Sequence, residues 1–322
     1  MPELPEVETI RIGLEKFLPG MQISEVNVLR PQSIRKQLGG SEAFNQKLVG
    51  ATFGQPSRRG KFMWVPIQNQ TEQPTQALVV HLAMSGQLRV FGESDTGESR
   101  NQGENHGIET PHRHTRVILQ GHDQDGRAQS LHFIDQRVFG HLTVVDLIPT
   151  ADGLAGGKGS AAATVPTGVD HIARDLLDPA LKPQTPAYQV LLKRIKQSKS
   201  GIKRILLDQR VVSGIGNIYA DEALWRARVN YARAANGISL KKLDELLQAA
   251  TGVMSEAVKV GGTSFDALYV NVNGESGYFS RSLHVYGRQG QPCDRCGTLI
   301  VRESFMNRGS HFCPRCQRRQ GE

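Results

Sequence analysis

The chain has 322 residues, a formal net charge of +8 and a pI near 9.4. This length favours two or three domains, and the excess of basic residues favours a polyanionic partner. No apolar run reaches the roughly 18 residues of a membrane span, so an ordinary transmembrane helix is excluded. The N-terminus lacks the basic and then apolar pattern of a secretion signal, which predicts a cytoplasmic protein.

The first three residues, Met1, Pro2 and Glu3, carry the most specific chemical signal. Removal of Met1 would give Pro2 a free secondary amine, a nucleophile that an internal proline does not offer because its nitrogen is an amide. Glu3 places a carboxylate directly beside that amine. Many chains begin with Met-Pro and have no such chemistry, so this pattern gains meaning only together with the motifs below.

A helix is expected from Pro5 to about Leu18, because proline suits the first helical turn and two early glutamates complement the helix dipole. Its apolar stripe, which we assign to the core, consists of Val7, Ile10, Leu14 and Phe17. The positive end of this helix dipole would lie near the Pro2 amine and lower its pKa.

Strand-like patterns dominate from Met21 to Leu147 and predict a β-sandwich. The expected strands are Gln22–Leu29, Phe62–Ile67, Ala77–Val90, Thr115–Leu119 and Ser130–Phe133. Residues 92–111 and 150–168 are rich in small and polar residues, and we interpret the second stretch as a flexible linker. The predicted domains are therefore a β domain at 1–149, a linker at 150–168, a helical domain at 169–262 and a C-terminal region at 263–322.

Helical spacing predicts the fold of the second half. One apolar stripe consists of Tyr188, Leu191, Leu192 and Ile195. A later helix is expected to begin after Ser239 as its N-cap and to end at Gly261 and Gly262.

Four cysteines, Cys293, Cys296, Cys313 and Cys316, form two Cys-x-x-Cys pairs. This spacing is typical of a structural zinc site with four thiolates, which would fold a small hairpin. Two disulfides or a redox pair are the competing interpretations. A basic intracellular protein makes both less favourable than zinc. Among the nearby arginines, Arg318 and Arg319 are expected to be solvated.

The segment from Gly214 to Glu222 resembles a phosphate-binding turn at the start of a helix. Glycines allow close approach of the backbone, and Asn217 is the expected N-cap of a helix whose free amides bind phosphate. A basic run with the same implication lies upstream and consists of Lys193, Arg194, Lys196, Lys199, Lys203 and Arg204.

These motifs together resemble the formamidopyrimidine-DNA glycosylase family. The resemblance rests on the N-terminal string from Met1 to Thr9, the glycine turn before Asn217, and the cysteine pairs. It implies an α+β fold with an N-terminal β-sandwich and flanking helices, a helix–two-turns–helix domain and a zinc-binding β-hairpin. It also implies a base-excision-repair enzyme that removes oxidised purines and cleaves the strand, with no redox cofactor or nucleotide.

The resemblance further implies roles for individual residues. In such an enzyme Pro2 is the nucleophile, Glu3 the general acid and base, and Lys61 and Arg308 assist the elimination of phosphate. The residues that match family contacts to DNA are His81, Met84, His112, Arg137, Phe139, Lys199, Asn217 and Tyr286. Met84, Arg137 and Phe139 would fill the gap left in the helix by an extruded nucleotide.

Two alternatives stay open at this point. An endonuclease VIII-type enzyme would use the same amine chemistry on oxidised pyrimidines, and a zinc-ribbon nucleic-acid-binding protein would have no catalysis. The chain also departs from the family pattern at Gln136, Val138 and Asp266, the last in a loop at 264–276 that closes over the extruded base in the family. The expected partner is damaged double-stranded DNA, bound by a monomer in the cytoplasm at the nucleoid.

Overall fold

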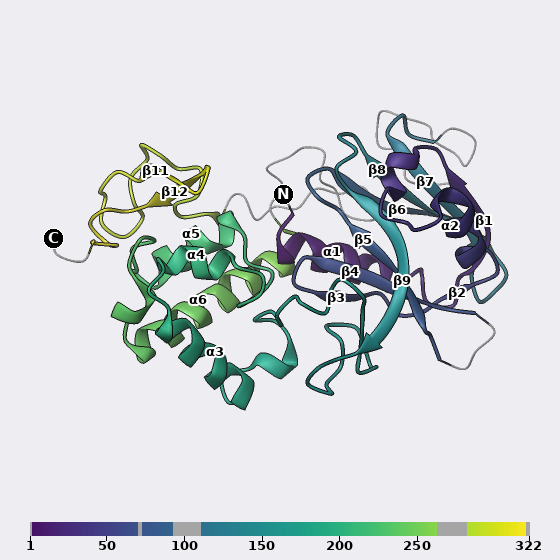
Figure 1. Cartoon of the computed structure of the whole chain (residues 1–322). Helices are drawn as coiled ribbons and strands as arrows, with labels where there is room; N and C mark the ends of the chain where they lie inside the picture. The colour runs from purple at the N-terminus through teal and green to yellow at the C-terminus, as the bar shows by residue number, and fades with distance from the viewer. Residues whose placement is uncertain (1, 70–72, 93–110, 263–281, 320–322) are drawn as a thin grey trace.

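The computed structural model describes residues 2–69, 73–92, 111–262 and 282–319. Figure 1 shows a sheet-rich part, a helical part and a small C-terminal hairpin in chain order. This arrangement confirms the predicted α+β class. The expected loop at 264–276, with Asp266, and most of the loop at 92–111 lie outside the described residues.

The sheet-rich part is built around antiparallel strands that form one hydrogen-bonded path in the order β10-β9-β5-β4-β2-β1-β7-β8-β6, with β3 paired to β4. The strands are β1 (Gln22–Val28), β2 (Thr52–Phe53), β3 (Ser57–Arg59), β4 (Phe62–Gln68), β5 (Gln76–His81), β6 (Gly86–Gly92), β7 (Thr115–His122), β8 (Ala128–Asp135), β9 (His141–Pro149) and β10 (Thr164–Pro166). The predicted strand Ala77–Val90 is two strands, because the chain turns at 82–85, where Ala83 has a φ of 52°.

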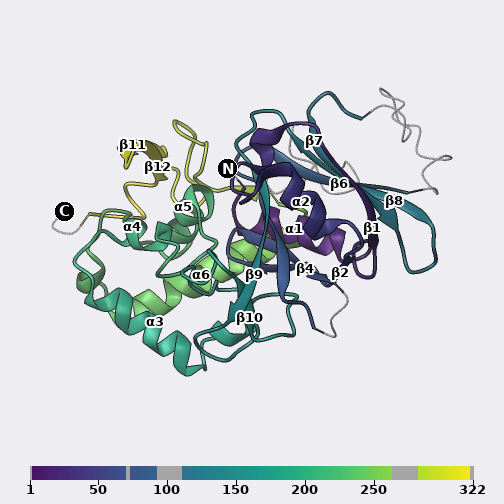
Figure 2. The ribbon, with the colours of Figure 1, turned by 45° about the vertical axis from the view of Figure 1, so that its right-hand side comes forward.

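Two helices accompany this sheet, α1 (Leu4–Leu14) and α2 (Gly40–Leu48). Helix α1 begins with a reciprocal capping box between Glu3 and Glu6. The helix is shorter than predicted, and Phe17 is 38% exposed beyond its end, so Phe17 does not belong to the core stripe. Figure 2 shows α1 between the sheet and the long helix of the second part, and α1 contacts both.

The helical part contains α3 (Pro186–Gln197), α4 (Ile202–Leu207), α5 (Asn217–Arg226) and α6 (Leu240–Lys259). The predicted stripe on α3 is buried, and the Ser239 hydroxyl accepts a hydrogen bond from the Lys242 amide, which confirms the predicted N-cap of α6. Gly261 and Gly262 both have positive φ just beyond that helix, as expected for its end. Leu4 belongs to this helical core and so joins the N-terminus to the second part.

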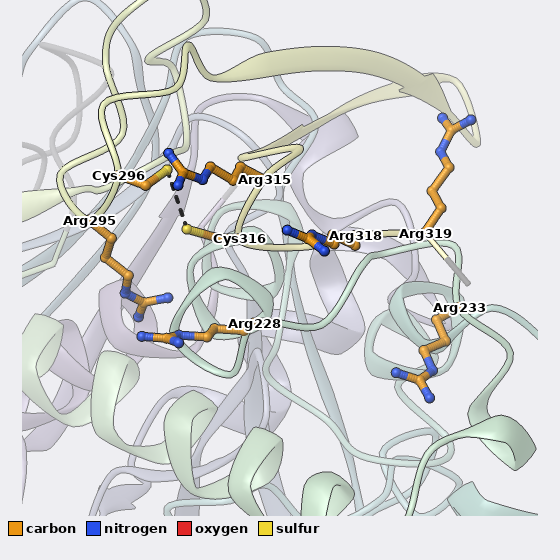
Figure 3. A pocket seen from close by; sticks show the side chains of 8 residues that line it. All are labelled: Arg228, Arg233, Arg295, Cys296, Arg315, Cys316, Arg318 and Arg319. Atoms are coloured by element: carbon orange, nitrogen blue, oxygen red, sulfur yellow. Dashed lines mark hydrogen bonds between the residues drawn. The ribbon is translucent and has the colours of Figure 1, made fainter. Parts of the chain in front are cut away.

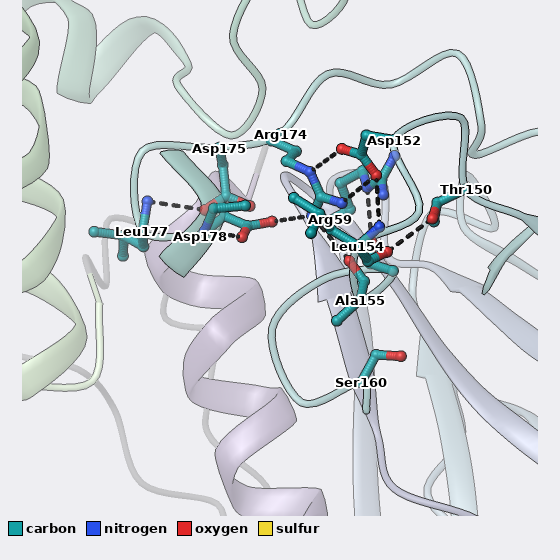
Figure 4. Close-up of polar contacts among 12 residues, drawn as sticks. Arg59, Thr150, Asp152, Leu154, Ala155, Ser160, Arg174, Asp175, Leu177 and Asp178 are labelled. Carbon is teal, nitrogen blue, oxygen red and sulfur yellow. Dashed lines mark hydrogen bonds and ion pairs between the residues drawn. The ribbon is translucent and has the colours of Figure 1, made fainter. Parts of the chain in front are cut away.

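The prediction that residues 150–168 form a flexible linker is wrong. The last residues of this segment form β10, which pairs with β9, and Figure 4 shows the preceding loop tied to its surroundings. Arg174 makes two hydrogen bonds to Asp152, at 2.7 and 2.8 Å, and one to Asp178 at 2.8 Å. The hydrogen bond from Arg174 lowers the pKa of Asp152 to about 2.

The glycines of this segment allow close packing and do not signal mobility. A Cβ atom at Gly156 would lie 2.0 Å from the carbonyl oxygen of Thr164, and one at Gly157 would lie 2.2 Å from that of Arg58. The Arg59 guanidinium donates to the Gly156 carbonyl at 2.8 Å. Composition alone predicted flexibility because these long-range contacts leave no local signal in the sequence.

The C-terminal hairpin consists of β11 (Val301–Phe305) and β12 (Arg308–Phe312), which form a two-stranded antiparallel sheet. Lys203 of α4 connects this hairpin to the helical part. Its side chain is fully buried, its ammonium nitrogen lies 2.6 Å from the Asp221 carboxylate, and it donates a hydrogen bond to the Ser310 hydroxyl at 2.7 Å. The prediction that the basic run contacts nucleic acid is therefore wrong for Lys203. Among the helices of the described ranges, none combines the length and the apolar character that a bilayer span needs.

Candidate active site and metal centre

The carboxylate of Glu3 lies on the N-terminus of α5. Its oxygens accept hydrogen bonds from the backbone amides of Gly216 at 2.7 Å, Ile218 at 2.9 Å and Tyr219 at 3.3 Å. The helix start that we predicted to bind phosphate is thus occupied by a carboxylate of the protein itself, which the same amides and helix dipole favour. Asn217 is not the N-cap either, because it is the first residue of the helix and Gly216 precedes it.

Two glycines make this approach possible. A Cβ atom at Gly216 would lie 2.2 Å from the carboxyl carbon of Glu3, and one at Gly214 would lie 2.5 Å from a methyl carbon of Leu4. Gly214 also has a φ of +90°, and its carbonyl accepts the Leu4 amide at 3.0 Å. The glycine turn therefore holds the first residues of the chain against the helical part.

Pro2 is buried and directly precedes this anchored carboxylate. The Glu3 amide donates to the Glu6 carboxylate at 2.9 Å, and the Tyr219 hydroxyl donates to the same side chain at 2.7 Å. Both the backbone and the side chain of Glu3 are therefore fixed, which also fixes the position of Pro2.

Burial raises the pKa of Glu3, and Glu6 adds to this effect, whereas Lys61 and the helix amides act in the opposite direction. Glu3 is only 4% exposed. A carboxyl group with a raised pKa retains its proton more readily, which suits a group that must both donate and accept a proton near neutral pH.

Lys61 lies at the turn between β3 and β4, where Gly60 has a φ of +58° and packs on Ser213 of the glycine turn. Burial lowers the pKa of Lys61, Arg308 acts in the same direction, and the negative charge of Glu3 opposes both. Glu3, Lys61 and Arg308 thus come from three distant parts of the sequence and influence one another electrostatically.

The residues from the hairpin side are held by Asn217, which the sequence singled out for another role, and by Glu222, which the sequence did not single out. The Asn217 side-chain amide donates to the Gly309 carbonyl at 2.9 Å, and Asn217 also hydrogen-bonds to the Tyr286 hydroxyl. Glu222, which is 1% exposed, accepts the backbone amides of residues 284–286 at 2.9 to 3.1 Å. The sequence signal that could have indicated a structural role for Glu222 is its place among apolar residues on the predicted helix.

Met84 and Phe139 are exposed apolar side chains, at 39% and 52%, on neighbouring loops, and Arg137 is exposed beside Phe139. Asp135 joins the two loops. Its carboxylate accepts the Ser85 hydroxyl and the Gly140 amide, the latter at 2.7 Å. The structure therefore brings together the three residues expected to replace an extruded nucleotide.

Three candidates remain, and they are His81, His112 and Lys199. The His81 ring stacks on that of His141 with centroids 5.0 Å apart, and burial followed by nearby Lys36 lowers the pKa of His81. His112 contacts the His114 ring, and Lys199 is exposed in the loop between α3 and α4.

The four cysteines meet as a metal site. Their Sγ atoms all lie within 4.8 Å of one another, and all four are free thiols. The indole nitrogen of Trp225 donates to Cys293 Sγ at 3.4 Å, which favours a thiolate there. Four converging sulfurs with no open position suit one structural zinc ion, and the alternative of two disulfides is wrong for this geometry.

The comparisons with known proteins agree with this geometry. Three family models match: the formamidopyrimidine-DNA glycosylase N-terminal domain at residues 1–142, the H2TH domain of the same enzymes at 177–268, and the zinc finger found in FPG and IleRS at 290–319. Sheet, glycine turn and zinc hairpin thus define the class of DNA glycosylases with a helix–two-turns–helix domain.

Named relatives extend the match over the whole chain. The chain is 49% identical over 320 residues to the formamidopyrimidine-DNA glycosylase of Leifsonia xyli, and 45% identical over 323 residues to that of Corynebacterium glutamicum, covering 99% of this chain and 100% of the relative in both cases. A mutant FPG of Lactococcus lactis in complex with Fapy-dG-containing DNA superposes with a TM-score of 0.76 at 28% identity, covering 99% of this chain and 100% of that one. The chain therefore belongs to the formamidopyrimidine-DNA glycosylase family.

Proposed function

We propose that this protein is a bifunctional DNA glycosylase and AP lyase that removes oxidised purines, such as 8-oxoguanine and formamidopyrimidines, from duplex DNA. Family membership supports the reaction, and the anchoring of Glu3 beside Pro2 is the observation that carries the assignment of residues. The protein acts as a monomer in the cytoplasm, at the nucleoid.

The first step joins the enzyme to the sugar. With Met1 removed, the Pro2 nitrogen attacks C1′ of the damaged nucleotide, the bond from C1′ to the base breaks, and the base leaves with a proton. Glu3 supplies the proton transfer that opens the sugar ring. Because Pro2 is a secondary amine, the product is an iminium that carries no N–H and so remains cationic.

The second step cleaves the strand. The iminium acidifies the C2′ proton, and loss of that proton expels the 3′ phosphate; a second elimination expels the 5′ phosphate. Lys61 and Arg308 neutralise the negative charge on these leaving phosphates. Hydrolysis of the final imine frees Pro2, and a one-nucleoside gap remains with a phosphate on each side.

DNA contacts surround this chemistry. Met84, Arg137 and Phe139 fill the vacated position in the base stack, which offsets part of the few kcal/mol that extrusion costs. His81, His112, Lys199, Asn217 and Tyr286 contact the backbone near the lesion. One zinc ion holds the hairpin that carries Arg308.

The test is cleavage of a duplex that holds one 8-oxoguanine opposite cytosine, with both end groups identified. We expect phosphate at both ends, and we expect Glu3→Gln to bind this duplex but cleave it at least about 100-fold more slowly. Glu25→Gln, an exposed strand residue, is the matched control and should cleave normally. Faster cleavage of a thymine glycol duplex would instead identify an endonuclease VIII-type enzyme, and an undiminished rate for Glu3→Gln would reject this mechanism.

A further inference from the structure

A basin of arginines lies beside the zinc site, and none of these arginines is among the residues assigned to catalysis or to DNA contact. It is an open hollow of about 720 Å³. Figure 3 shows that its arginines come from the loop after α5 and from both cysteine knuckles. They are Arg228, Arg233, Arg295, Arg315, Arg318 and Arg319.

The positive charge of this arginine basin exceeds what its surroundings neutralise. Arg319 is paired with Glu303 at 2.6 Å. Zinc held by four thiolates carries two negative charges when bound. Six arginines therefore exceed these three negative charges by three. The basin is more basic than neutralisation of the metal centre requires.

Several of these side chains are free to bind a ligand. Within the described residues, the guanidinium groups of Arg228, Arg315 and Arg318 make no hydrogen bond or ion pair to the protein. Arg295 is fixed by stacking on Trp225, 3.7 Å from the ring centroid, and donates to the Trp225 carbonyl at 2.6 Å.

The arginine basin is separated from the candidate active site by the length of a helix. Glu3 caps the N-terminus of α5, whereas Arg228 follows its C-terminus. Ten helical residues span about 15 Å. The basin does not belong to the set of residues assigned to the damaged nucleotide.

We propose that the arginine basin is a second DNA site, which holds the phosphate backbone of an undamaged duplex segment while another segment occupies the active site. Guanidinium groups bind phosphate oxygens in pairs and release counterions from DNA, so three free arginines form an adequate contact. The lining consists only of arginine and cysteine, and it lacks the aliphatic and aromatic side chains that anchor a peptide. This favours a nucleic-acid backbone over an acidic protein segment.

A second DNA site allows direct transfer of the enzyme between two DNA segments. With a single site, the bound duplex must leave before another binds, so its dissociation rate does not depend on competitor concentration. With two sites, a competitor duplex binds the second site before the first duplex leaves, and this increases the dissociation rate of the first duplex. The proposal rests on DNA being the substrate but not on the Pro2 chemistry.

The experiment measures how fast the zinc-loaded protein releases a short fluorescent duplex that holds an uncleavable abasic analogue. Undamaged duplex is added as competitor at increasing concentration. We expect the release rate to rise with competitor for the unmodified protein, and the slope of this rise to fall roughly tenfold for the double variant Arg228→Gln, Arg318→Gln. The control is Lys16→Gln with Lys241→Gln, which removes the same charge from exposed positions elsewhere.

Strand cleavage of a lesion duplex separates this test from that of the proposed function, because it should be unchanged in the basin variant. Zinc content and melting temperature should match those of the unmodified protein. The proposal would be overturned if the release rate did not depend on competitor concentration. It would also be overturned if this dependence had the same slope in the basin variant as in the unmodified protein. Polyglutamate that speeds release as well as DNA does would overturn it too, since this result would indicate an acidic protein partner.

Discussion

The Oε2 atom of Glu3 lies 2.7 Å from the backbone nitrogen of Gly216, which is 213 residues further along the chain. This contact joins the first residues to the helical part at the point where the proposed reaction takes place. It uses the amides of a helix start to hold a carboxylate, and it leaves no room for a side chain at Gly216.

Gly216→Ala is therefore expected to displace Glu3 and Pro2. A Cβ atom would lie 2.2 Å from the Glu3 carboxyl carbon, so either the turn or the N-terminus must move. A shift of about 1 Å in a catalytic group costs on the order of 100-fold in rate. Single-turnover cleavage of an 8-oxoguanine duplex measures this loss. Gly252→Ala, where the nearest atom is 3.7 Å away, is the control and should retain activity.

Asp175→Asn is expected to destabilise the junction between the sheet and the helices. Asp175 is 1% exposed, pairs with fully buried Arg58 at 2.8 Å and accepts the Gly60 amide at 2.8 Å. Loss of its charge leaves Arg58 with the Glu8 carboxylate and the Gly60 carbonyl as partners, and breaking a buried pair typically costs about 3–5 kcal/mol.

Urea unfolding measures the free-energy change in Asp175→Asn. Asp125→Asn serves as control, because its pair with Arg127 is about two-thirds exposed on both sides and such pairs contribute little. Equal stability of the two variants would show that the Arg58–Asp175 pair does not hold the junction.

Acid sensitivity should depend on His132. Burial lowers the pKa of this imidazole to about 4, whereas an unfolded histidine titrates near 6.5. Between these two values the unfolded chain binds more protons, so stability falls as the pH falls from about 6.5 towards 4. From pH 6.5 to 5 the loss amounts to about 2 kcal/mol.

His132→Gln should reduce this loss between pH 7 and pH 5, measured by urea unfolding with excess zinc at both pH values. The comparison variant is His122→Gln, an exposed residue of the neighbouring strand β7, which should lose as much stability as the unmodified protein. An unchanged pH dependence in His132→Gln would mean that another group causes the acid sensitivity.

Removal of zinc should abolish strand cleavage, because the zinc site holds the hairpin that carries Arg308. Without the metal, the two cysteine knuckles are no longer joined, and β12 is held to the helical part by contacts such as those of Lys203 and Asn217 alone, which do not fix the position of Arg308. Chelation is expected to release one zinc ion per chain and to stop cleavage, and added zinc should restore it. Full cleavage by the zinc-free protein would contradict this role for the hairpin.

Local signals explain which parts of the site the sequence predicted. The cysteine pairs need only short spacing, and the helix after Ser239 needs only its cap and its apolar stripe, so both predictions were confirmed. The error at Asn217 has a tertiary cause, because the helix cap is supplied by Glu3 from the other end of the chain. The error at 150–168 also has a tertiary cause, because Gly157 packs on Arg58 and Gly156 accepts a hydrogen bond from Arg59.

The central claim is that Pro2 becomes covalently bound to the sugar, and borohydride trapping tests it most directly. The reagent reduces the iminium during reaction with a lesion duplex, and mass spectrometry of the digested protein locates the adduct. We predict a sugar remnant on the peptide that begins with Pro2, with Met1 absent. An adduct on Lys61 instead, or full-rate cleavage by protein that retains Met1, would contradict the account.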